Sequence, residues 1–202
     1  MDEGEREQAL LTALTTEHFV LQTSRGATVT ESVGRATVFL SLLSASLIGL
    51  GFVSSSERLV TPYLGAVLPT LVVTGLLTFA RLVQNMVENS LDLQRIQRIR
   101  AYYHHNVSTG HDFFADAVSD EDVTRAAWRA VGARPGWFQL MLTTAALVGA
   151  VNALLVGLGV TLLVGLLGAG SAVAVGVGVV VAMAAFAFQL AFISRRSISR
   201  VS

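Results

Sequence analysis

The residues best suited to chemistry lie in one stretch near the middle of the chain. His104, His105, His111 and Asp112 follow one another closely, and Asp116 comes four residues later. Imidazole and carboxylate groups bind zinc, but a zinc site needs three or four of them in fixed geometry. The spacing HH-x5-HD-x3-D matches no standard ligand pattern, and adjacent histidines on a loop are more often simply solvated. We therefore treat these residues as weak candidates for a metal site and expect no cofactor.

The same stretch allows a second interpretation. Tyr102 and Tyr103 stand next to several arginines, and juxtamembrane arginine clusters recognise anionic lipid. The acidic residues that follow, from Asp112 to Asp122, weaken that interpretation.

Several classes of enzyme are excluded by residue type. The chain has no cysteine, so a thiolate nucleophile and a disulfide are both impossible. All 14 basic residues are arginine, which excludes Schiff-base chemistry and a P-loop lysine. The serine-hydrolase, zinc-protease and P-loop signatures are also missing. We expect a protein that is not an enzyme. The mixed charge of its polar segments does not indicate nucleic-acid binding.

The hydropathy pattern indicates a membrane protein. Hydrophobic residues make up 52% of the chain and charged residues 14%, where a soluble domain carries about 25% charged residues. The 60 residues between Arg134 and Arg195 contain no charge and no histidine. That stretch has room for two bilayer crossings of roughly 20 residues each. The sequence thus predicts an all-α membrane protein with four transmembrane helices.

The predicted organisation has five segments. They are a cytoplasmic N-terminal segment (1–35), a transmembrane hairpin (36–80, with spans of about 36–53 and 59–80), a helical cytoplasmic loop (81–136), a second transmembrane hairpin (137–193, with spans of about 137–158 and 172–193) and a cytoplasmic tail (194–202).

The polar segments also carry helical patterns. Apolar residues recur at helical spacing between about Glu5 and Gln22, which predicts a short amphipathic helix against the membrane or another cytoplasmic helix. The Ser-, Thr- and Gly-rich residues 24–31 predict a break before the first span. From Arg81 to His105 the second span is expected to continue as an amphipathic helix.

Arginine placement predicts the orientation. Three arginines precede the first span, one lies between the first two spans, seven lie in the central loop and three follow the last span. With four spans, 13 of the 14 arginines lie on one side, which the positive-inside rule makes cytoplasmic.

Small residues in the third span are candidates for helix packing. Gly149, Ala153 and Gly157 are spaced four apart, and Asn152 lies among them. Small residues let helices approach closely in lipid. They could pack subunits together or pack the helices of one chain. Asn152 could line a pore or, as is more common, bond to a neighbouring helix.

Two stretches, LTTEHFVLQTSRGATVTESVGRATVFLSLLSASLIGLGF and RIQRIRAYYHH, resemble small four-span integral membrane proteins of actinobacteria. The resemblance covers residues from about Leu11 to His105. It implies a location in the bacterial cytoplasmic membrane, and it supplies no activity and no functional residues. The arginine count and the even number of spans place both termini on the cytoplasmic side.

Two functions remain open. One is a membrane-anchored interaction or structural protein that presents cytoplasmic helices to a partner protein. The other is a subunit of a homo-oligomeric pore lined by Ser, Thr and Asn side chains. The lipid bilayer is a partner in both cases.

Overall fold

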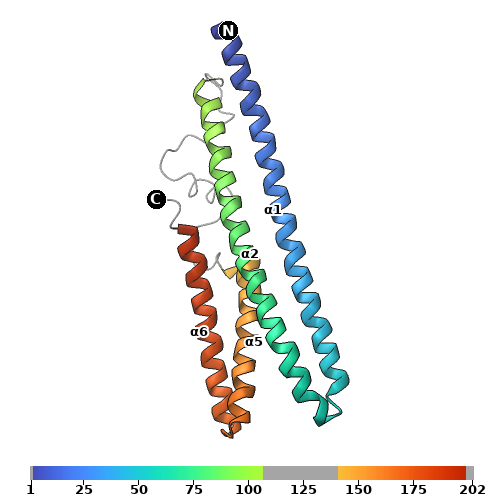
Figure 1. The fold of residues 1–202 in the computed structure, drawn as a ribbon. Coiled ribbons are helices and arrows are strands. Elements are labelled where there is room, and N and C mark those ends of the chain that lie inside the picture. The colour runs from blue at the N-terminus through green and yellow to red at the C-terminus, as the bar shows by residue number, and fades with distance from the viewer. Residues whose placement is uncertain (1, 107–140, 199–202) are drawn as a thin grey trace.

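The computed structural model describes residues 2–106 and 141–198, and helices account for nearly all of them (Figure 1). The helices are α1 (Glu3–Val53), α2 (Glu57–Asn106), α5 (Thr144–Leu166) and α6 (Ser171–Ile198). Each is long and apolar enough to cross a membrane. The all-α fold and the four candidate membrane-spanning helices are therefore confirmed for the part of the chain that the structure describes.

Helix α1 begins at a complete capping box. The Asp2 side chain accepts a hydrogen bond from the Glu3 N–H at 2.7 Å, and the Glu5 side chain accepts one from the Asp2 N–H at 3.0 Å. These bonds satisfy donors that an uncapped helix would leave open. The helix then continues without interruption to Val53.

The predicted break at residues 24–31 is wrong. The hydroxyls of Thr28 and Thr30 each donate to the backbone carbonyl four residues earlier, at 2.9 Å, so they do not compete with the helix for its own N–H groups. Ser24 and Arg25 also bond to side chains of α2. Contacts with the neighbouring helix thus override the weak helix propensity of this segment.

The four helices form two antiparallel pairs (Figure 1). Helix α1 packs along α2, and α5 packs along α6. Helix α2 joins the pairs by packing on α5, whereas the described parts of α1 and α6 do not touch. Within residues 2–106 and 141–198, one long face of α1 has no neighbouring helix.

Both connections within the pairs are short. Residues 54–56 join α1 to α2, and residues 167–170 join α5 to α6. Gly168 has a φ of 87°, which favours glycine and lets the second turn close tightly. Both turns lie at the end of the molecule away from the N-terminus (Figure 1).

Both helices of the second hairpin extend beyond the span ends expected from the sequence. Thr143 caps α5 by accepting a hydrogen bond from the Ala146 N–H at 3.1 Å, and α5 then runs to Leu166 instead of ending near 158. The predicted start near 137 lies outside the described residues. Helix α6 begins at Ser171 and extends to Ile198, past the predicted end at 193.

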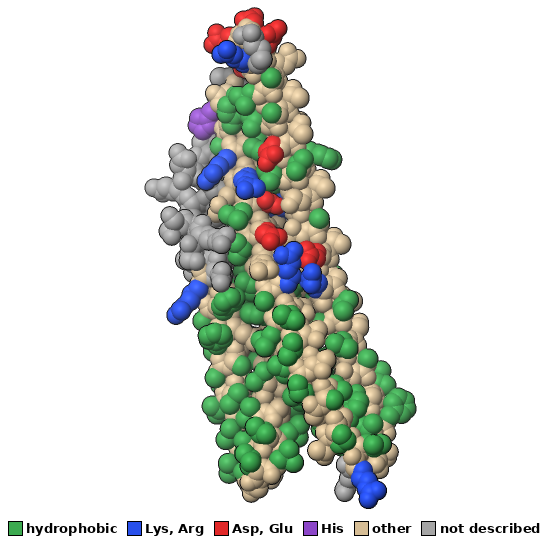
Figure 2. Space-filling model, viewed as in Figure 1, with side chains coloured by type: hydrophobic (Ala, Val, Ile, Leu, Met, Phe, Trp, Pro, Cys, Tyr) green, Lys and Arg blue, Asp and Glu red, His purple; other side chains and the backbone are tan. Residues whose placement is uncertain are grey.

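The larger core lies where all four helices meet, and we call this part the apolar bundle (residues 36–80 and 144–193). Its most deeply buried large side chains are Phe39, Val148 and Ile193, each fully enclosed. Its outer surface is also apolar, whereas charged side chains gather over the other half of the molecule (Figure 2). An apolar exterior around a packed interior is expected of a protein whose solvent is lipid.

Beyond the apolar bundle, α1 and α2 continue together as a two-helix stalk, which we define as residues 3–35 and 81–106. With a rise of about 1.5 Å per residue, its longer helix extends for about 50 Å. The stalk has a small core of its own, formed by Leu21, Ile96 and Ile99, with Leu14 and Tyr103 against it.

Candidate functional site

A row of polar contacts joins the two helices of the stalk, and we call it the polar ladder. Its cross-helix pairs are Thr15–Tyr103, Ser24–Asp92, Arg25–Asn89, Ser32–Asn85 and Glu31–Arg81. From Thr15–Tyr103 to Glu31–Arg81 the α2 numbers fall as the α1 numbers rise, as antiparallel helices require. A shift of α2 by one turn would break every pair, so the ladder fixes the register of the stalk.

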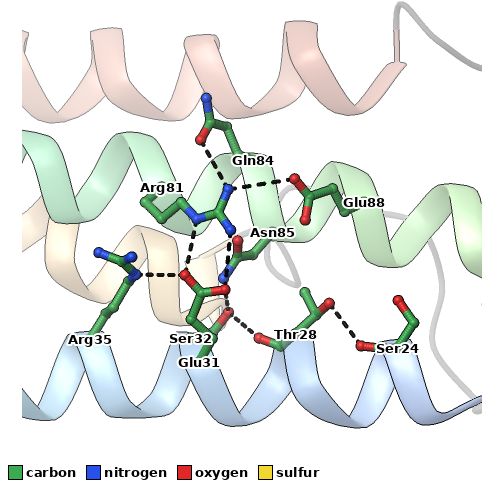
Figure 3. Close-up of polar contacts among 9 residues, drawn as sticks. All are labelled: Ser24, Thr28, Glu31, Ser32, Arg35, Arg81, Gln84, Asn85 and Glu88. Carbon is green, nitrogen blue, oxygen red and sulfur yellow. Dashed lines mark hydrogen bonds and ion pairs between the residues drawn. The ribbon is translucent and has the colours of Figure 1, made fainter.

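The ladder's ionic cluster lies where the stalk meets the apolar bundle (Figure 3). Arg81 of α2 donates from Nε and Nη2 to the two carboxylate oxygens of Glu31, at 3.0 and 3.1 Å. Arg35 donates to the same carboxylate from the other side, at 2.7 Å. Arg81 also lies 3.6 Å from the Glu88 carboxylate. Glu31 is therefore held between two guanidinium groups.

These contacts change the acidity of both partners. The hydrogen bonds from Arg81 and then Arg35 lower the pKa of the Glu31 carboxyl to about 2. The bond to Glu31 raises the pKa of the Arg81 guanidinium. Both groups are thus charged at neutral pH. Each remains about one-third exposed, so solvent screens the pair.

Two polar side chains of the ladder, Asn85 and Asp92, are buried, and the Arg25–Asn89 pair is partly buried. Asn85 is only 1% exposed, and its Nδ2 donates to the Ser32 hydroxyl at 3.1 Å. Asp92, which is 9% exposed, accepts from the Ser24 hydroxyl at 2.9 Å. Arg25 donates to the Asn89 side-chain oxygen at 3.0 Å. A buried polar group is tolerated when it is hydrogen-bonded, and Asp92 and the Asn85 Nδ2 meet that condition. The Asn85 Oδ1 is buried and has no hydrogen-bond partner within the described residues.

The predicted packing residues lie in the interior of the single chain. A Cβ added to Gly157 of α5 would come within 2.7 Å of the Gly178 carbonyl oxygen of α6. Gly149 leaves room for the Gln189 side chain of α6, and Ala153 is buried. These small residues let α5 and α6 approach each other closely.

Asn152 turns towards α2 and not towards α6. Its Oδ1 lies 2.6 Å from the position that a Cβ of Gly75 would occupy, so its amide fills the space that this glycine leaves. Asn152 is fully buried, and neither Oδ1 nor Nδ2 has a hydrogen-bond partner within the described residues. Asn152 of the second hairpin thus packs against Gly75 of the first, with Phe39 beside it.

The structure describes only two of the residues predicted as weak metal-site candidates. His104 and His105 occupy the last turn of α2, with ring centroids 5.7 Å apart. His111, Asp112 and Asp116 lie outside the described residues. Within residues 2–106 and 141–198, no three His, Asp or Glu side chains come together as metal ligands would.

Sequence reasoning missed the polar ladder, although part of its signal was present. Asn89 interrupts the apolar stripe of α2, and this interruption marks a rung of the ladder, because Asn89 bonds to Arg25. The partner in α1 could not be identified, because the segment that supplies it was expected to break. No family model matches this chain, and no curated protein or solved structure shows significant similarity to it.

Proposed function

We propose that this protein is a membrane-anchored interaction protein that presents the two-helix stalk to a cytoplasmic protein partner. The observation that carries this proposal is continuity: α1 and α2 each run unbroken from the apolar bundle into the stalk. A partner that binds the stalk would act on two membrane helices directly. The polar ladder supports the proposal, because it keeps the presented surface in one register.

The cytoplasmic side and the bacterial membrane are part of the same proposal. They are supported by the arginine count, since a four-span topology puts 13 of 14 arginines on one side, and by the resemblance to actinobacterial membrane proteins. A reporter enzyme fused after Arg100 tests the orientation. We expect activity of a reporter that works only in the cytoplasm, and activity of a reporter that works only outside would overturn the assignment.

The experiment for the partner uses a photo-crosslinking amino acid in the full-length protein in its native cells. It replaces Arg98, which is exposed on the stalk, and in a control Val73, which is 55% exposed on the apolar half of the same helix. We expect a reproducible adduct with a cytoplasmic protein from position 98 and none from position 73. Failure to capture such a protein from position 98 and from a second stalk position, Arg95, would contradict the proposal.

The second candidate function is a subunit of a pore, and a different measurement distinguishes it from the interaction protein. Large side chains, including Phe39, Phe79 and Ile193, fill the interior of the described bundle, so a conducting path would have to lie between copies. Ion flux through liposomes that contain the purified protein would favour the pore. Absence of flux at every protein-to-lipid ratio would favour the interaction protein.

A further inference from the structure

The face of α1 that points away from α2 carries a seven-residue repeat. Small residues recur at every seventh position over almost the whole helix, and we assign them to heptad position a: Ala9, Thr16, Thr23, Thr30, Thr37, Ser44 and Gly51. Three residues after each of the first six is a position d: Thr12, Phe19, Gly26, Val33, Leu40 and Leu47. We call these two rows the α1 seam.

Burial shows that the seam is not covered by the described helices. All seven a residues are exposed, and so are all the d residues except the half-buried Leu40. The buried residues of α1 are Leu21, Ala36 and Phe39, and none of them occupies an a or d position. The seam is therefore a second face, made of small residues and other uncharged residues, separate from the one that packs on α2.

The charged residues of α1 also lie outside the seam. Between Ala9 and Gly51 the charged and histidine residues are Glu17, His18, Arg25, Glu31 and Arg35. Every one of them lies at heptad position b, c or f. The a and d rows and the flanking e and g rows carry no charge over this length. A face that repeats strictly every seven residues stays turned towards a partner helix along a left-handed supercoil, and here small residues would take the place of the usual apolar a residues.

The hydroxyls of the seam are already satisfied. Those of Thr16, Thr23, Thr30, Thr37 and Ser44 each donate to the backbone carbonyl four residues earlier, at 2.9 or 3.0 Å. The seam threonines therefore do not depend on water for a hydrogen-bond partner. A partner helix can cover them without leaving an unpaired polar group, which would be costly both in lipid and in a helix interface.

The surface of the seam is also shaped for a close neighbour. A shallow groove of about 450 Å³ is lined by Thr37, Leu40, Ser41, Ser44, Ala45 and Ile48. A Cβ added to Gly26 or Gly51 would meet no atom within 4 Å, so no contact inside the chain requires these glycines. Small residues of this kind let a second helix approach closely in the membrane.

We propose that the α1 seam binds the α1 seam of a second copy of this chain, as a parallel two-stranded coiled coil. The seam crosses from the apolar bundle into the stalk without a break, so lipid could cover only one part of it. Phe19 and Val33, which are 72% and 56% exposed, lie in the stalk part. The occupant must be a long helix that crosses the same boundary, and α1 itself has that length and that pattern.

The symmetry and the size of the contact agree with a second copy. Copies inserted in one membrane share one orientation, so their α1 helices are parallel and related by a two-fold axis. From position 9 to position 51 the seam is about 63 Å long, and a helix is about 10 Å wide. A contact of about 600 Å² per copy lies at the low end of specific protein interfaces. This inference does not rest on the proposed partner of the stalk, because that partner would be a different protein.

The test is cysteine crosslinking of the full-length protein in its native membrane. The natural chain has no cysteine, so each introduced cysteine reports alone. A disulfide forms only when the two Cα atoms come within about 7 Å. We expect dimers on oxidation from the seam variants Thr16→Cys, Phe19→Cys and Thr37→Cys. We expect several-fold less from their b-position neighbours Glu17→Cys and Val38→Cys. Equal yields at seam and control positions would overturn the proposal, and so would adducts with another membrane protein without self-crosslinks.

A second measurement separates assembly from folding. In lipid nanodiscs we expect a particle with twice the 21.4 kDa protein mass of one chain. The double variant Thr23→Glu/Thr30→Glu should be a monomer with unchanged helix content, because both positions are exposed. The matched variant Thr23→Val/Thr30→Val should remain a dimer, since valine keeps the shape of threonine. A wild-type monomer at all protein-to-lipid ratios would contradict the proposal.

Discussion

Arg81 binds the carboxylate of Glu31 through two parallel hydrogen bonds, from Nε at 3.0 Å and from Nη2 at 3.1 Å. The two residues are 50 positions apart in the chain and come from different helices. The contact lies at the level where α1 and α2 leave the apolar bundle, so it couples the stalk to the membrane part. A planar guanidinium is better suited to this geometry than an ammonium group, because it matches both carboxylate oxygens at once.

A charge exchange tests whether this pair sets the register. We expect Glu31→Arg alone to lower the thermal midpoint of stalk unfolding, because it places three arginines together. The double variant Glu31→Arg/Arg81→Glu should recover part of the loss, since it restores one opposite pair. The measurement is a double-mutant cycle on the midpoint. Additive effects of the two single changes would show that the pair does not contribute.

The low pKa of Glu31 predicts the pH range in which the pair acts. A carboxyl whose pKa is lowered in the folded state stabilises the fold above its unfolded pKa of about 4.5. That stabilisation decreases as the pH falls from about 4.5 towards about 2. The raised pKa of Arg81 adds a stabilisation that is fully present throughout this acid range and is lost only at strongly alkaline pH, as the pH rises through that raised pKa.

The stalk register should therefore not respond to pH between neutrality and about 5. A distance measured between spin labels on α1 and α2 checks this expectation. In the variant Arg81→Gln, the midpoint of the acid transition should move to higher pH, because the largest cause of the shift is removed. An unchanged midpoint in this variant would contradict the assignment.

The small core of the stalk should be sensitive to truncation. Leu21 of α1 and Ile96 of α2 belong to the same small core, and each is 3% exposed. Removing such a side chain costs about 2–5 kcal/mol in a well-packed core. We expect Ile96→Ala to speed amide hydrogen exchange in the stalk and to leave α5 and α6 unchanged. Leu10→Ala, at a position that is 45% exposed, is the control and should change stability by less than about 0.5 kcal/mol.

The small size of Gly75 should be needed to accommodate the larger side chain of Asn152. A Cβ on Gly75 would come within 2.6 Å of Asn152 Oδ1 and 3.0 Å of Phe39 Cζ. We expect Gly75→Ala to destabilise the docking of the two hairpins by about 1–3 kcal/mol, as overpacking does. The double variant Gly75→Ala/Asn152→Ala should regain part of this loss, measured by unfolding in detergent. Gly65→Ala, where a Cβ would meet no atom within 4 Å, is the control in the same helix.

The sequence was sufficient for the spans but not for the contacts between them. Hydropathy located all four helices, because an uncharged stretch of 60 residues has few other interpretations. The end of the first helix at Val53 also agrees with the predicted span. The start of α5 at Thr144 is set by the Thr143 cap, and hydropathy does not distinguish this residue within an uncharged stretch.

The candidate site was harder to predict, because it is made of pairs. Glu31 and Arg81 are unremarkable as single residues, and only the antiparallel packing of two long helices brings them together. The same holds for Asn152, whose neighbour Gly75 belongs to another hairpin. The α1 seam is different, since its seven-residue spacing and its lack of charge can be read from one helix alone.

The short connections at the far end of the molecule have a consequence for biogenesis. Residues 54–56 and 167–170 are all that separates the helices of each pair, and the only ionisable side chains beside these turns are those of Glu57 and Arg58. If the stalk stays on the side of synthesis, each hairpin enters the bilayer by carrying only a few, nearly neutral residues across it. In that orientation the charged residues of the stalk stay on the side where the chain is made, and only the two short turns cross the bilayer.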